Sequence, residues 1–137
     1  MRLVFLFGRR KMAKITASAP ELLTKDIRSA CDYYRDKLAF IYELYNDPPT
    51  FAILRRDEHA LMLAEAPAKA KLTPNWKIAD KIWNVYFWVD DADAIYKELI
   101  ARGARIDYSI YTTPWGIREF GVQDLDDHDI AFGQILA

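Results

Sequence analysis

Apolar and polar residues alternate in short segments along most of this chain. Apolar residues recur at three- and four-residue spacing in residues 26–38 and again between Asp91 and Gly103, which predicts two helices. Asp26 and Asp91 are suitable N-terminal caps, and Gly103 is a suitable C-terminal stop. The alternating segments lie between turn-forming Pro, Gly and Asp residues. They predict strands at residues 15–24, 40–45, 51–55, 60–65, 82–89, 105–111, 117–123 and 129–135.

The order of these elements is the same in both halves of the chain: strand, helix and then three strands. Asp26 and Asp91 precede the two helices, and His59 and His128 stand at equivalent entries to the last strand of each half. Such a repeat indicates one supersecondary unit used twice. We therefore expect an α+β fold of two tandem β-α-β-β-β units, forming a curved mixed sheet with a concave groove and helices on its convex side.

The repeat also suggests how the chain is organised. A single domain is expected over residues 13–137, with repeats at 13–66 and 82–136 and a linker at 67–81. Residues 1–12 are interpreted as a disordered N-terminal extension. The apolar run within this extension is far too short to span a bilayer and short for a signal-peptide core, so the expected location is cytoplasmic, with no membrane partner.

Charge and cysteine content narrow the classes of function. The 19 basic and 20 acidic residues give a net charge of −1, which lacks the basic excess of a nucleic-acid binder, so no nucleic-acid partner is expected. The single cysteine, Cys31, excludes an intrachain disulfide and falls on the predicted apolar side of the first helix. Aromatic residues make up 14% of the chain and could fill a core or line a groove.

Two motifs accompany the duplication. One is Asp-Tyr-Tyr-Arg-Asp-Lys-Leu-Ala-Phe at residues 32–40. The other is Pro-Trp-Gly-Ile-Arg-Glu-Phe at 114–120, followed by Asp-Leu-Asp-Asp-His at 124–128 and Phe-Gly at 132–133. Together they resemble the vicinal oxygen chelate superfamily, which includes glyoxalase I, extradiol dioxygenases and the fosfomycin- and bleomycin-resistance proteins. Ala39, Leu125 and Asp127 depart from the Gly, Pro and Gly that the family usually has there.

The resemblance also implies where a metal ion would bind in the enzymes of the superfamily. Their His, Gln and Glu ligands come from the first, fourth, fifth and eighth strands, and the matching positions here are Ala19, Met62, Asn84 and Ala131. Alanine offers no donor and a thioether is a poor ligand for hard or borderline divalent ions. The sequence therefore favours binding over catalysis, with no metal and no cofactor.

The predicted groove is aromatic and acidic. Alternation along residues 82–89 places Asn84, Tyr86 and Trp88 on the concave side and Trp83 on the opposite one with Val85, Phe87 and Val89. A flat or cationic organic molecule would suit such a groove. The resemblance implies a protein of bleomycin-resistance type that sequesters its ligand, in a homodimer whose grooves are completed by both chains. The expected ligand-binding residues are Asn84, Tyr86, Trp88, Glu119, Asp129, Met62 and Glu21.

Two alternatives stay open at this point. A glyoxalase- or dioxygenase-like enzyme with a rearranged metal site would need Glu21, Glu119, His59 or His128 to converge, although hydrogen-bonded histidines at strand entries are the simpler interpretation. A non-catalytic structural module would have its groove closed by its own side chains, such as Trp88, Tyr86 and Met62.

Overall fold

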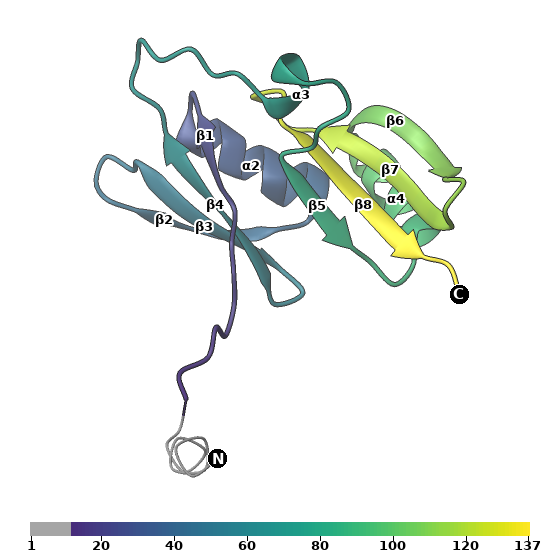
Figure 1. Ribbon diagram of the computed structural model, residues 1–137. Helices are drawn as coiled ribbons and strands as arrows, with labels where there is room; N and C mark the ends of the chain where they lie inside the picture. Colours follow the sequence, from purple (N-terminus) through teal and green to yellow (C-terminus); the bar gives the residue numbers. More distant parts are fainter. Residues whose placement is uncertain (1–11) are drawn as a thin grey trace.

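The computed structural model describes residues 12–137, so the predicted N-terminal extension lies almost entirely outside the described residues. The fold is the predicted tandem duplication, with one helix and four strands in each half (Figure 1). The first half contains β1 (Glu21–Thr24), α2 (Ile27–Leu38), β2 (Ile41–Tyr45), β3 (Phe51–Arg56) and β4 (His59–Glu65). The second contains β5 (Val85–Trp88), α4 (Ala92–Arg102), β6 (Arg105–Thr112), β7 (Ile117–Gln123) and β8 (Asp129–Ile135).

Each half forms its own mixed four-stranded sheet. The first sheet has the order β1-β4-β3-β2 and the second has the order β5-β8-β7-β6. In each, the strand before the helix pairs in parallel with the last strand, and the other pairs are antiparallel. The predicted α+β class with helices on one side of curved mixed sheets is confirmed, but the eight strands are divided between two sheets. The reason is that β1 and β5 are both edge strands, and no strand of one half pairs with the other.

The ends of the two helices follow the predicted signals. The Asp26 carboxylate accepts hydrogen bonds from the N–H groups of Arg28 and Ser29, and the Asp91 carboxylate accepts one from Ala94. Gly103 ends α4 in the left-handed conformation. Ala39 ends α2 in the same conformation, with φ of 62°, where glycine would carry no steric cost. The chain therefore forms the family's turn with a less suitable residue.

Three elements differ from the prediction. β1 and β5 are short: residues 12–20 and 81–84 lie outside the strands, although Pro20 and Asn84 each keep one backbone hydrogen bond, with Met62 and Asp129. The linker holds a short helix, α3 (Asn75–Ile78). Because β5 begins only at Val85, strand alternation does not extend back to Trp83, which lies beside Tyr86 and not on the opposite face. The prediction for Trp83 was wrong for this reason.

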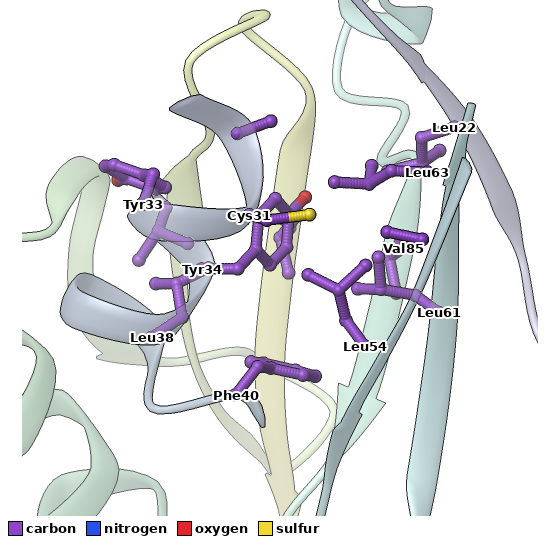
Figure 2. Close-up of a cluster of buried hydrophobic side chains, with 14 of the residues drawn as sticks. Leu22, Cys31, Tyr33, Tyr34, Leu38, Phe40, Leu54, Leu61, Leu63 and Val85 are labelled. Carbon is purple, nitrogen blue, oxygen red and sulfur yellow. The ribbon is translucent and has the colours of Figure 1, made fainter. Parts of the chain in front are cut away.

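The core lies between the helices and the sheets and is shared by both halves. Figure 2 shows Cys31 and Tyr34 of α2 turned toward leucines of the first sheet and Tyr33 on the other side of the helix; Val85 of β5 belongs to the same buried cluster. Cys31 is fully buried, and burial raises the pKa of its thiol to about 11, so it packs as a small apolar residue. The helices α2 and α4 also contact each other, which fixes the two units relative to one another.

Candidate functional site

The side of the second sheet that faces away from α4 carries a continuous group of aromatic rings. We call this group the aromatic face; its members are Trp83, Tyr86, Trp88, Tyr108 and Tyr111. The centroid of the Tyr86 ring lies 4.8 Å from that of Trp83 and 4.7 Å from that of Trp88. The Tyr108 and Tyr111 rings are 6.1 Å apart. Trp88 is 62% exposed, so the face is open to a ligand at that end.

A carboxylate lies beneath these rings. Glu119 of β7 is only 5% exposed, and both of its oxygens accept hydrogen bonds from aromatic residues. The Tyr86 hydroxyl donates to Oε1 at 2.7 Å and the Tyr108 hydroxyl donates to Oε2 at 2.8 Å. The Trp83 indole N–H donates in turn to the Tyr108 hydroxyl at 3.2 Å. The aromatic face therefore covers a negative charge that is held by hydrogen bonds.

Burial and the neighbouring carboxylate together fix the protonation of the two tyrosines. Burial raises the pKa of both Tyr86 and Tyr108, and their hydrogen bonds to Glu119 raise the pKa of each further. Both hydroxyls accordingly stay protonated donors at neutral pH. This leaves the carboxylate as the charged group of the site.

Two glycines let the tyrosine rings lie close to the sheet. A Cβ atom at Gly133 of β8 would be 1.9 Å from the Tyr86 hydroxyl oxygen, and one at Gly121 of β7 would be 2.3 Å from Cε1 of Tyr108. Neither ring could keep its position over a larger residue. The Phe-Gly pair at residues 132–133, which belongs to the second motif, thus has a direct role in building the aromatic face.

A cavity of about 440 Å³ adjoins the aromatic face at the free edge of β5. Tyr86 and Trp88 line it together with the apolar rings of Phe40, Phe87 and Phe132. Its polar rim comes from Arg56, Asp57 and His59 at the β3–β4 turn and from Asp90. Apolar walls with a few charged groups, in a volume of this size, are typical of small-molecule sites.

The seven predicted ligand-binding residues fall into separate groups. Tyr86, Trp88 and Glu119 come together in the aromatic face. Asp129 lies on the same side of the sheet, where its carboxylate accepts a hydrogen bond from the Gln123 amide. The remaining three residues lie elsewhere: Glu21 and Met62 are register partners in the first sheet, and Glu21 and Asn84 line a second cavity.

The prediction missed Trp83, Tyr108 and Tyr111. Tyr108 and Tyr111 are three residues apart and would point to opposite sides of a regular strand. Irregularities in the pairing of β6 with β7 around Tyr108 bring both rings to one side. The two tyrosines in residues 105–112 are visible in the sequence, but their common face is not.

The acidic turn between β7 and β8 is a structural device. Asp124, Asp126 and His128 form the one group of three potential metal ligands within 4.8 Å of one another in residues 12–137. Asp124 is 1% exposed and is already fully hydrogen-bonded. Its Oδ1 accepts from the backbone of Asp126 and His128, and its Oδ2 accepts from the Tyr34 hydroxyl at 2.7 Å and faces Nδ1 of His128 at 2.9 Å. Asp127 closes the turn with φ of 64°, in place of glycine.

The superfamily's metal does not fit the residues at the expected positions. Ala19 and Ala131 have no donor atom, and the oxygen of the Asn84 side chain accepts a hydrogen bond from the backbone of Asn75. Of the four residues predicted for a rearranged site, only His128 belongs to a group of three close ligand residues, the acidic turn described above. In the described part of the chain Glu21, Glu119 and His59 belong to no such group. The structure brings aromatic rings and one carboxylate together at this site, in place of a ligand set for an ion.

The fold and site define a duplicated β-α-β-β-β protein with an aromatic, acidic binding surface. Residues 14–132 match the family model of the Glyoxalase/Bleomycin resistance protein/Dioxygenase superfamily, and the chain belongs to this superfamily. A search of curated proteins found no match. No helix of residues 12–137 is long and apolar enough to cross a membrane.

Several solved structures share the fold. TioX from Micromonospora sp. ML1 is 24% identical, with a TM-score of 0.70, over 88% of this chain and 99% of that one. The bleomycin-binding protein from bleomycin-producing Streptomyces verticillus, complexed with copper(II)-bleomycin, is 23% identical, with a TM-score of 0.64, over 92% and 99%. Lactoylglutathione lyase from Agrobacterium tumefaciens is 17% identical, with a TM-score of 0.65, over 89% and 96%. At these identities the likeness is one of fold.

Proposed function

We propose that this protein binds and sequesters a flat, cationic aromatic small molecule on the aromatic face, without a metal ion. One observation carries the proposal: the Glu119 carboxylate is buried beneath Tyr86 and Tyr108, next to the exposed ring of Trp88. An electron-rich surface over a fixed negative charge attracts a cation by cation–π contact and by charge. The adjoining cavity would hold a substituent of the ligand.

Binding on this face should prefer a cation to a neutral ring of the same shape. A favourable cation–π contact contributes about 0.5–2 kcal/mol, and the partly screened charge of Glu119 adds to it. A neutral ring would gain only stacking and burial. The structure of the Streptomyces verticillus bleomycin-binding protein with copper(II)-bleomycin supports the proposal, because it is an example of this fold bound to a drug.

A matched pair of dyes tests the proposal. N-methylacridinium is a permanent cation, and acridine is neutral at about pH 8; binding of each is followed by tryptophan fluorescence and calorimetry. We expect N-methylacridinium to bind about ten times more tightly than acridine. Glu119→Gln should reduce this preference, because only the cation–π contact with the rings remains, and it should leave acridine binding unchanged. Equal binding of the two dyes to the wild-type protein would refute the proposal.

The bleomycin-resistance interpretation needs its own test. Copper(II)-bleomycin is titrated into the purified protein, and the chain is expressed in a bleomycin-sensitive bacterium. Tight binding with improved survival would support a resistance role. If the protein binds N-methylacridinium but not copper(II)-bleomycin, the proposal of a flat cationic ligand stands and bleomycin is excluded as that ligand. The predicted cytoplasmic location stays a prediction, which cell fractionation in the source organism would test.

We further propose a homodimer in which the first sheet of one copy lies opposite the second sheet of the other. The side of the first sheet that faces away from α2 is apolar and open: Ile41 is 71% exposed, and Leu23 and Tyr45 are also exposed. Such a dimer would bring Met62 and Glu21 of one copy toward the aromatic face of the other. Light scattering should give twice the monomer mass, and Ile41→Glu should give a monomer. A monomeric wild-type protein at micromolar concentration would overturn this.

A further inference from the structure

A second cavity, separate from the aromatic face, lies between β1 and the linker. Its volume is about 370 Å³, at the lower end of the range for small-molecule sites. Three consecutive residues of β1 form one wall and three consecutive residues of the linker form another. The lining residues are Glu21, Leu22, Leu23, Lys71, Leu72, Thr73, Asn84 and His128.

The linker is fixed over this end of the molecule, so the cavity is a built feature. The Asn75 backbone N–H donates to Oδ1 of Asn84, and the Asn75 side chain donates to the carbonyl of Trp83. The Trp76 indole N–H donates to the carbonyl of Asp127 at 2.7 Å. These bonds join α3 to the strand entries of the second sheet and hold the preceding residues, 71–73, beside β1.

Two polar side chains that line the cavity are held in place by hydrogen bonds at one of their polar atoms. Asn84 has its oxygen engaged by Asn75, which leaves its NH₂ group without a partner among residues 12–137. Nδ1 of His128 is hydrogen-bonded to Asp124, which leaves Nε2 likewise without a partner among residues 12–137. No buried side-chain nitrogen or oxygen of this part of the chain lacks a partner, so both nitrogens must be accessible. Both residues line the cavity, and these two accessible nitrogens are its candidate donors.

The charges on the wall distinguish between ligand classes. Lys71 and Glu21 form no ion pair with any residue from 12 to 137, although both line the cavity. A simple carboxylate would meet repulsion from Glu21, and a simple amine would meet repulsion from Lys71. A zwitterion satisfies both charges at once. Leu23 and Leu72 add apolar surface beside these charges.

We propose that this cavity binds a small α-amino acid with an apolar side chain. Its carboxylate contacts Lys71, the Asn84 amide and the His128 ring, its ammonium group contacts Glu21, and its side chain packs on Leu23 and Leu72. Burial of His128 lowers the pKa of its ring, but the hydrogen bond to Asp124 and that residue's charge outweigh burial and raise it overall. A larger fraction of imidazolium at neutral pH supports a carboxylate at Nε2.

Three compounds of one shape test the ligand class. L-leucine carries both charged groups, 4-methylpentanoate lacks the ammonium group and 3-methylbutylamine lacks the carboxylate. We expect leucine to bind at least about ten times more tightly than either analogue, since each lost charge contact is worth about tenfold. Leucine should shift the NMR signals of the Asn84 side-chain amide and the His128 ring. Equal binding of the three, or no shift with leucine at about 10 mM, would overturn the proposal.

Variants assign the contacts. Asn84→Asp keeps the oxygen that accepts from Asn75 and replaces the NH₂ donor by a second carboxylate oxygen, so leucine affinity should fall at least about tenfold while the melting temperature holds. Lys71→Met should lower the affinity for leucine by a similar factor. Lys69→Met, in the same linker but outside the cavity, is the matched control and should bind as the wild type does.

Glu21→Gln tests the ammonium contact. This variant should lower the affinity for leucine about tenfold, and it should not lower the affinity for 4-methylpentanoate. Wild-type affinity in both Asn84→Asp and Lys71→Met would overturn the assignment. No residue that lines this cavity belongs to the aromatic face, so the dye experiment and the leucine experiment have separate outcomes.

Discussion

Gly133 decides whether Tyr86 can cover Glu119, and replacing it by alanine should show this. The added Cβ would lie 1.9 Å from the Tyr86 hydroxyl oxygen and 2.6 Å from Cζ, so the ring must leave its place. Moving it breaks the 2.7 Å hydrogen bond to Glu119 and the packing against Trp83 and Trp88. Overpacking costs about 1–3 kcal/mol, and loss of a hydrogen bond to a charged group costs about 1.5–3 kcal/mol.

These two costs overlap, because the displaced ring is also the lost donor, and we expect Gly133→Ala to lower the free energy of unfolding by about 3 kcal/mol. Urea denaturation followed by circular dichroism, at one fixed protein concentration, measures this change. The same variant should weaken the binding of N-methylacridinium, because the Tyr86 ring leaves its place between Trp83 and Trp88.

A double-mutant cycle isolates the cause. Tyr86→Ala removes the ring that the alanine would meet, so in that background Gly133→Ala should cost less than about 0.5 kcal/mol, or stabilise the strand slightly. Gly121→Ala, paired with Tyr108→Ala, provides the matched cycle on the neighbouring strand. An equal cost of Gly133→Ala with and without the Tyr86 ring would show that Gly133 is needed for its backbone and would refute this reasoning.

Three further predictions concern the buried polar groups of the second unit. Burial and nearby carboxylates raise the pKa of Asp129 above 3.8, so ionisation disfavours the folded state. Asp129→Asn should increase the free energy of unfolding at pH 7, and this gain should vanish as the pH falls below 3.8. Tyr34→Phe leaves the Asp124 carboxylate without its buried donor and should cost about 2 kcal/mol in urea denaturation, whereas Tyr42→Phe, at a more exposed hydroxyl, should cost less than about 1 kcal/mol. The raised pKa of His128 means that its contribution to stability is complete below 6.5 and is lost as the pH rises through the folded value. The stability difference between wild type and His128→Gln should therefore shrink as the pH rises above 6.5, and a constant difference would contradict this account.

Local signals in the sequence were sufficient for the repeat and for much of each unit. Asp26, Asp91 and Gly103 act within one helical turn of their own position, so neighbouring residues determine what they do. Alternation in β7 placed Glu119 on the side opposite Phe120, as observed, because β7 is a regular strand with a buried face. The superfamily was identified on the same basis, from short motifs at fixed places in the duplicated order.

The composition of the aromatic face depended on contacts that no local pattern specifies. Trp83 lies outside β5, and an irregularity in β6 turns Tyr108 and Tyr111 to one side; both features arise where a strand meets its neighbour. The second cavity likewise needs β1, the linker, the residue before β5 and the β7–β8 turn to meet, which brings Glu21 near Asn84 and His128 from the other half of the chain. The sequence by itself determined the two units and the faces of their regular strands, because side-chain periodicity is a property of each strand alone. Only the tertiary structure decided which rings cover Glu119 and which charges share a cavity, because those arrangements depend on the packing of strand edges and turns that are distant in the sequence.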